Sequence, residues 1–273
     1  MVYFFIIEHT TKQFGDMRSS QLNITSRGKN LAPVYFRIGW VSIPGRGLAV
    51  FIGFLIFLIL AAGEAKKNHI DFKHILNFSL LVLFIAIPLF GYVFFNLLAD
   101  FSKITMFPLN LFYPYRLSSS SLMAGLGCFV VIFCYARMAQ LPLGRFADTL
   151  AFGFFPAAAI GRLGCLLGGC CYGKPTGFFI SIFYAGAHRH PTPLYEALGS
   201  MFIFILILVY RKHHSHGSGR LFVQSLLIAY PLLRTATEPL RADTVFIAGF
   251  WPLPFIICLF SVLTGTIILC RMG

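Results

Sequence analysis

The chain has 273 residues, of which 58% are hydrophobic and only 11% are charged, and its mean hydropathy is +0.79. Because about a quarter of the residues in soluble domains are charged, this composition excludes a soluble globular protein and indicates an integral membrane protein. The formal charge of +13, from 22 basic against 9 acidic residues, indicates contact with anionic phospholipid, or loop charges that set topology, rather than nucleic acid.

The first 33 residues are polar, basic and without hydrophobic periodicity. We therefore expect an amino-terminal extension at 1–33, followed by a membrane domain at 34–273. The apolar run from Met1 to Ile7 is too short for a cleavable signal, and no small-residue cleavage site follows it. Insertion is expected to depend on the later apolar runs.

Seven apolar runs follow the extension, and they predict an all-α polytopic bundle of about seven transmembrane helices. The runs cover residues 47–63, 75–98, 121–136, 147–166, 194–210, 220–237 and 252–270. The fourth and sixth runs carry Arg162 and Arg234 near one end. Since an arginine costs roughly 2.5 to 3.5 kcal/mol at the centre of a membrane helix, these helices are expected to line an inter-helix lipid cavity.

Nine basic residues in alternate loops are predicted to lie on one side of the membrane. They are Lys66, Lys67, Lys73, Arg137, Arg145, Arg211, Lys212, Arg220 and Arg271. If the cations of the polar motifs bind a ligand, the remaining bias puts the carboxyl terminus in the cytoplasm and the active face toward the periplasm or exterior. A count of every basic residue gives the opposite orientation.

A glycine and cysteine block at 161–176 ends the fourth run. Arg162, Cys165 and Gly169 are spaced i, i+3 and i+7, so on a continuous helix they share one face and the guanidinium is available to a phosphate. The glycines also fit close packing between helices. The pairs with this small-xxx-small spacing are Gly164 with Gly168 and Gly169 with Gly173.

A second polar cluster, Arg189 to Glu196, precedes the fifth run. Its prolines predict an extended entry into a helix. His190, Tyr195 and Glu196 offer an imidazole, a phenol and a carboxylate at the membrane boundary. A helix start with an interfacial tyrosine is the alternative interpretation of the same residues.

A third cluster, at the end of the sixth run, is formed by Arg234, Glu238 and Arg241. Their spacing of i, i+4 and i+7 puts all three on one side if the helix continues through Pro239. Glu238 is then expected to orient the two arginines by pairing with them. A structural ion pair within the bundle is the alternative.

The seven cysteines lie mostly within apolar runs, where cysteine behaves as a small hydrophobic residue, so we expect no disulfide framework. Cys165, Cys170 and Cys171 have no second cysteine pair or histidines at the spacing of a zinc site. Helix packing is the simplest interpretation of these three thiols, with a reactive thiol and a metal site as alternatives. We predict no metal and no cofactor.

Together, the clusters resemble the phosphatidylglycerol:prolipoprotein diacylglyceryl transferases of the bacterial inner membrane. The resemblance covers about residues 33 to 260 and rests on Pro33, Ala65-Lys66-Lys67, Gly161-Arg162-Leu163-Gly164, Gly173-Lys174-Pro175-Thr176, His190-Pro191, Leu194-Tyr195-Glu196, Tyr230, Arg234, Glu238, Arg241 and Asp243. It implies transfer of the diacylglyceryl group of phosphatidylglycerol to the lipobox cysteine thiol of a preprolipoprotein, with release of glycerol phosphate. The implied partners are phosphatidylglycerol, the lipobox peptide and membrane lipids, and no nucleic acid.

The resemblance also implies roles for residues of the three clusters. Arg162 and Arg241 are expected to stabilise the phosphate leaving group, which gains charge in the reaction. The predicted catalytic residues are Arg162, Arg241, Glu238 and His190, and the predicted substrate-binding residues are Arg234, Arg189, Gly173, Tyr195, Glu196 and Cys165. His190, Glu196 and Glu238 are the candidate general bases, and the sequence does not choose among them.

The sequence departs from this family at three places. The family's His-Gly-Gly-Leu motif reads Met123-Ala124-Gly125-Leu126 here, Cys165 and Cys170 stand where the family usually has Asn and Glu, and Gly249-Phe250-Trp251-Pro252 replaces a stretch rich in Gln and Ser. Two alternative hypotheses follow. One is an altered paralogue that binds anionic phospholipid without transfer, and the other is a transferase that uses Cys170 or Cys171 covalently.

Overall fold

The computed structural model describes residues 35–38, 41–94, 121–184, 186–213, 219–242, 246–247 and 251–272. The predicted extension at 1–33, together with Asp243, Gly249 and Phe250, lies outside the described residues.

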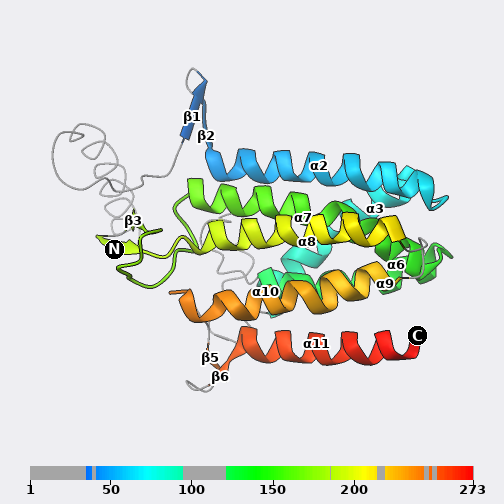
Figure 1. Cartoon of the computed structure of the whole chain (residues 1–273). Helices are drawn as coiled ribbons and strands as arrows, with labels where there is room; N and C mark the ends of the chain where they lie inside the picture. Colours follow the sequence, from blue (N-terminus) through cyan, green and yellow to red (C-terminus); the bar gives the residue numbers. More distant parts are fainter. Residues whose placement is uncertain are drawn as a thin grey trace, which may run out of the picture.

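The described part of each of the seven apolar runs is helical, as predicted, except Pro252, which belongs to a strand (Figure 1). Two of them change helix type along their length: α3 continues into the π-helix η1, and the sixth run passes from α9 through η4 and α10 to the short 3-10 turn η5. The bounds are α2 Gly45–Lys67, α3 Phe72–Leu81, η1 Val82–Phe94, α6 Ser121–Met138, α7 Leu143–Leu167, α8 Thr192–His213, α9 Arg220–Phe222, η4 Val223–Ala229, α10 Tyr230–Thr237, η5 Glu238–Leu240 and α11 Leu253–Met272.

Within the described ranges, 4 helices are long and apolar enough to cross a membrane: Gly45–Lys67, Leu143–Leu167, Thr192–Lys212 and Pro254–Arg271. Their outer faces are apolar, and side chains such as Ile59 (69% exposed) and Phe260 (71% exposed) are largely uncovered. Large exposed apolar faces of this kind are stable only against lipid. The protein is therefore a helical membrane protein.

Helix α7 lies at the centre of the bundle. Phe146 and Leu150 join it to a core shared with α2, α3 and α6, while Phe155 joins it to a second core with α8 and α9. Glycines bring it close to α2, because a Cβ on Gly153 would lie 2.9 Å from the carbonyl oxygen of Phe57. This contact fixes the end of α7 that carries Arg162.

The small-xxx-small interpretation of the glycine block is confirmed for its first pair. A Cβ on Gly164 would lie 2.6 Å from Cβ of Ala49 on α2, and one on Gly168 would lie 3.0 Å from Cβ of Arg46. The second pair does not pack helices, because Gly169 and Gly173 follow the end of α7 at Leu167.

Three antiparallel two-stranded hairpins, which the all-α prediction omitted, lie at one end of the bundle, on the left in Figure 1. Their strands are β1 Tyr35–Ile38 with β2 Val41–Pro44, β3 Ile182–Tyr184 with β4 Ala187–Arg189, and β5 Phe246–Ile247 with β6 Trp251–Pro252. The carboxyl end of α7 and the start of α8 lie at the same end (Figure 1).

The carboxyl terminus lies at the opposite end of the bundle (Figure 1). The helix ends that carry or adjoin the nine basic residues of the alternate loops lie at this end too. A buried ion pair joins two helices there, since Nη2 of Arg211 on α8 lies 2.6 Å from Oε1 of Glu64 on α2. The basic loops and the hairpins therefore lie at opposite ends.

Candidate active site

A short backbone ladder brings the three polar clusters together at the hairpin end. The segment 173–176 runs between the two other clusters: the amide of Gly173 donates to the carbonyl of His190 at 2.9 Å, and the amide of Lys174 donates to the carbonyl of Leu240 at 2.8 Å. The glycine and cysteine block thus becomes the middle strand between residues that precede α8 and residues that follow α10.

At Gly173 both neighbouring segments approach the strand closely. A Cβ there would lie 2.6 Å from the carbonyl oxygen of Leu240 and 2.9 Å from that of His190. Backbone atoms cannot move away as a flexible side chain can, so the ladder requires glycine here.

The carboxylate of Glu196, one turn into α8, is the centre of the site. Its Oε2 lies 2.8 Å from Nε of Arg162. Its Oε1 lies 2.9 Å from Nη1 of Arg241 and 3.3 Å from Nη1 of Arg234. Three guanidinium groups from α7, from α10 and from the segment after η5 therefore meet at one carboxylate.

A second carboxylate completes the cluster. Oε2 of Glu238 lies 2.7 Å from Nη1 of Arg234, and the hydroxyl of Thr237 donates to Oε1 of Glu196 at 3.4 Å. Thr237 is a member that the sequence did not single out. In the sequence, the only indication that Thr237 belongs to the site is its position immediately before Glu238.

These five charged side chains carry a net charge of +1, from three arginines and two glutamates. They are buried from solvent: the exposed fractions are 3% for Glu196, 5% for Glu238, 5% for Arg241 and 7% for Arg234. Three guanidinium groups gathered at one place can bind an anion through charge-assisted hydrogen bonds. Arg162, whose side chain is 15% exposed, is the most accessible of the five.

The sequence analysis expected the residues of the first and third clusters to meet by sharing the face of a continuous helix, and the structure differs from this in both clusters. Gly169 has a φ of +61° and lies beyond the end of α7, so the predicted face shared with Arg162 was wrong for this residue. The helix also stops before Pro239, because α10 ends at Thr237 and Arg241 is extended. A proline removes a backbone donor and crowds the preceding turn, which explains the stop. Glu238 pairs with Arg234, while Glu196 bridges the arginines.

The remaining residues of the second cluster support the hairpin. Nε of Arg189 donates to the carbonyl of Tyr184 at 3.1 Å, its Nη1 donates to the carbonyl of Gly173 at 3.4 Å, and its guanidinium lies 5.0 Å from the ring centre of Tyr172. Nδ1 of His190 lies 3.3 Å from the hydroxyl of Tyr195. None of the contacts described for these three cluster residues reaches Glu196.

The fold also gathers three thiols beside the arginines. The sulfur atoms of Cys165, Cys170 and Cys171 all lie within 4.8 Å of one another. Hydrogen bonds from the other two thiols, and then the nearby guanidinium groups of Arg241 and Arg162, lower the pKa of Cys171. Hydrogen bonds with Cys165 and Cys171 raise the pKa of Cys170. The thiol cluster and the arginines are thus in direct electrostatic contact.

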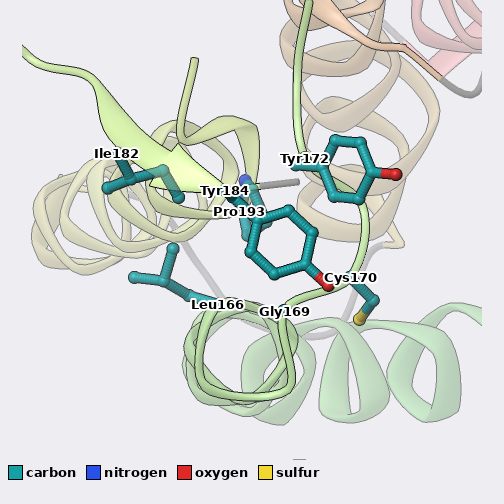
Figure 2. Close-up of a pocket in the computed structure, with 7 residues that line it drawn as sticks. All are labelled: Leu166, Gly169, Cys170, Tyr172, Ile182, Tyr184 and Pro193. Carbon is teal, nitrogen blue, oxygen red and sulfur yellow. The ribbon is translucent and has the colours of Figure 1, made fainter. Parts of the chain in front are cut away.

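A small hollow opens next to Cys170 (Figure 2). Its wall is mostly apolar, formed by Leu166, Ile182 and Pro193 together with the rings of Tyr172 and Tyr184. The five charged side chains of the cluster are not among the residues that line this hollow.

The fold and the site define a helical membrane protein with a buried cluster of three arginines and two glutamates at one end of its bundle. The chain belongs to the prolipoprotein diacylglyceryl transferase family, whose model matches residues 33–271. The resemblance inferred from the motifs is therefore confirmed.

Three relatives illustrate the similarity, and each is named phosphatidylglycerol–prolipoprotein diacylglyceryl transferase. The protein of Clostridium tetani is 26% identical over 244 residues, which cover 86% of this chain and 95% of that protein. Transferase 1 of Clostridium perfringens is 28% identical over 227 residues, covering 78% and 84%. The protein of Lactobacillus johnsonii is 29% identical over 238 residues, covering 80% and 82%.

Proposed function

We propose that this protein transfers the diacylglyceryl group of phosphatidylglycerol to the lipobox cysteine thiol of a preprolipoprotein. The observation that carries the proposal is the convergence of Arg162, Arg234 and Arg241 on Glu196 in a buried cluster of net positive charge. Membership of the family supports the same activity, since its relatives are named for it.

The charge of the cluster matches the chemistry. The acceptor thiolate attacks the glycerol methylene carbon bonded to the phosphate oxygen, a C–S bond forms, and the C–O bond breaks with its electron pair going to the phosphate. The phosphodiester of charge −1 becomes a glycerol phosphate of higher charge. Arginines already held in place by Glu196 and Glu238 stabilise that growing charge without reorganisation, which lowers the barrier.

Within this proposal, Arg162 and Arg241 bind the phosphate and Arg234 holds the carboxylates that orient them. Glu238 acts through its ion pair with Arg234. Gly173 and Arg189 maintain the hairpin next to the phosphate. His190 and Tyr195, joined by their hydrogen bond, lie at the start of α8, where they form the peptide side of the site together with Cys165.

The proposal includes an arrangement in the bacterial inner membrane. All seven helical runs cross the bilayer, with the shorter ones completing the bundle, and the lipid enters a cavity between helices near Arg162. The end with the nine basic residues faces the cytoplasm, since basic loops are retained there. The hairpins and the site then face the periplasm or exterior, where the lipobox peptide arrives. Residues 1–33 form an extension separate from the domain at 34–273.

Transfer is tested with the purified full chain in vesicles of phosphatidylglycerol and a synthetic lipobox peptide. We expect the peptide to gain the mass of a diacylglyceryl group and glycerol phosphate to appear in equal amount, and we expect Arg162→Gln to slow the formation of both about 10² to 10³-fold. Complementation of a bacterial strain that lacks its own transferase tests the activity in cells.

The alternative of phospholipid binding without transfer has no family support. It predicts that phosphatidylglycerol binds and that neither product forms. That outcome with folded protein, together with a failure to complement, would reject the proposed function.

A further inference from the structure

We propose that Cys165, Cys170 and Cys171 form a zinc site with an open fourth position, at which the acceptor thiol binds and loses its proton. The inference rests on the proposed function, because it explains how that reaction obtains its nucleophile. The sequence analysis predicted no metal here, because no second cysteine pair or histidines stand at the spacing of a zinc site. Zinc binding by these thiols would overturn that prediction.

Geometry is the first argument for the site. Tetrahedral zinc with Zn–S bonds of about 2.3 Å holds its sulfur ligands about 3.8 Å apart. The three sulfur atoms already lie within 4.8 Å of one another, so small side-chain rotations are enough to close around the ion. Three protein ligands and an open position are the pattern of a catalytic zinc site rather than a structural one.

The backbone holds the thiols together without any help from an ion. Cys165 is on the last turns of α7, and the chain then turns back through Gly169 with a φ of +61° and Cys171 with a φ of +58°. The thiol of Cys170 donates to the carbonyl of Cys165 at 3.5 Å. Thr192, at the start of α8, donates its hydroxyl to the carbonyl of Cys171, so two helices fix the loop.

Charge is the second argument. Three thiolates and one Zn²⁺ carry a net charge of −1, and a fourth thiolate makes it −2. Arg162 lies one turn before Cys165 on α7. Arg241 forms a backbone bridge with Gly173, two residues after Cys171. Both arginines pair with Glu196. The same two arginines therefore offset the negative charge of a zinc thiolate complex on one side and that of a phosphate on the other.

The site also supplies a step that the arginine cluster does not. The acceptor thiol has an ordinary pKa of about 8.5, so it is mostly protonated at neutral pH. Of the three candidate bases, the carboxylates of Glu196 and Glu238 are engaged with arginines, and Nδ1 of His190 lies 3.3 Å from the hydroxyl of Tyr195. Zinc deprotonates a coordinating thiol outright. Cys165, Cys170 and Cys171 would hold the ion, and zinc bound there would lower the pKa of an acceptor thiol at its open position, whose proton would pass to solvent before the sulfur attacks the lipid carbon.

The experiment compares the full-length wild-type protein with Cys170→Ser and Cys171→Ser, and uses Cys134→Ser as the control, because Cys134 is an exposed thiol on α6. All are purified with a phosphine reductant and dialysed against zinc, and folding is checked by thermal melting. We expect about one zinc ion per wild-type chain, and an affinity more than about 100-fold weaker in the two cluster variants, since loss of an outer partner alone costs about 10 to 100-fold. Cys134→Ser should bind zinc like wild type.

Cobalt provides a second readout that does not depend on activity. Co²⁺ in place of zinc should give the intense charge-transfer absorption of thiolate ligation in wild type and Cys134→Ser, and a much weaker band in Cys170→Ser. Absence of zinc, equal zinc affinity in Cys170→Ser, or a disulfide among the three thiols under the phosphine would each overturn the site.

Activity separates this inference from the proposed function. Removal of zinc with a chelator should stop transfer to the lipobox peptide, and zinc but not magnesium should restore it. Full transfer by metal-free protein, with loss only in Arg162→Gln, overturns the zinc role and leaves the function standing. Zinc bound by the three thiols without any transfer or complementation rejects the function and the activation step, and supports the zinc site alone.

Discussion

Arg162 and Arg241 contact opposite oxygens of one carboxylate, that of Glu196, at 2.8 Å and 2.9 Å. Arg162 belongs to α7, whereas Arg241 follows the 3-10 turn after α10. Glu196 therefore works as a spacer that holds two guanidinium groups around one point. A phosphate site shared by Arg162 and Arg241 requires that the two guanidinium groups lie close together, as they do here.

Replacing either arginine should remove the stabilisation of the phosphate leaving group. We expect Arg162→Gln and Arg241→Gln each to lower the rate constant of transfer about 10² to 10³-fold, the cost of removing one preorganised donor. The double variant should be little worse than either single variant, because the two groups act on one phosphate. Mass spectrometry of the peptide product measures these rates.

The matched control for these variants is Arg137→Gln. Arg137 is an exposed arginine at the end of α6, where its guanidinium lies 5.0 Å from the ring centre of Phe133. Its loss should leave the transfer rate within a factor of about two, since exposed charges contribute little. An equal loss in Arg137→Gln would show that the effect is general destabilisation.

The second prediction concerns Glu196 and compares it with Glu64. Both carboxylates are buried, with 3% and 4% exposed, and both pair with arginine. Either change to Gln leaves a buried guanidinium uncompensated, so each should lower the free energy of unfolding by about 3 to 5 kcal/mol. Thermal melting in detergent measures the loss.

Only Glu196→Gln should also change the response to lipid. Its cluster then carries a charge of +2, from three arginines and Glu238, so phosphatidylglycerol should raise its melting temperature more than it does for Glu64→Gln. Glu196→Gln should also lose transfer, while Glu64→Gln keeps its KM. If the lipid affected both variants equally, the arginine cluster would not be the headgroup site.

The helices could be predicted from the sequence because long apolar runs specify their own structure in a membrane. Arg162 could be singled out because its presence within such a run is costly. The central role of Glu196 could not, since its partners come from three elements that meet only through the ladder at 173–176.

The thiol cluster was missed for a related reason. Cys170 and Cys171 follow Cys165 by five and six positions. On an uninterrupted helix this spacing would place the three thiols on different faces. The left-handed residues Gly169 and Cys171 reverse the chain and bring the sulfur atoms together. A positive φ at a cysteine is rare, so no local pattern predicts it.

The third prediction tests the ladder itself. Gly173→Ala would put a Cβ 2.6 Å from the carbonyl oxygen of Leu240, which should displace the strand and separate the arginines. We expect transfer to fall at least about tenfold, because small misplacements of a catalytic group cost up to about 10²-fold. Gly177→Ala is the control, since nothing lies within 4 Å of its added Cβ. Equal activity of both variants would mean that the ladder does not position the site.

The last prediction uses pH to detect the thiolate at Cys171 in metal-free protein. Since its pKa is lowered by the other two thiols and by Arg241 and Arg162, the thiolate persists below the ordinary cysteine value of about 8.5. Iodoacetamide reacts with the thiolate, so Cys171 should be alkylated at a pH where the exposed Cys134 reacts slowly. Cys170, whose pKa is raised, should react only at a pH above that value.

Removing the nearby positive charge should reduce this difference in reactivity. In Arg241→Gln the pKa of Cys171 loses one of the charges that lower it, so its alkylation curve should move to higher pH while that of Cys134 stays in place. Peptide mass spectrometry after short exposure at a series of pH values gives each curve separately. If the curves of Cys171 and Cys134 coincided in the wild-type protein, the guanidinium groups would not be close enough to stabilise a thiolate, and the charge argument for the zinc site would fail with them.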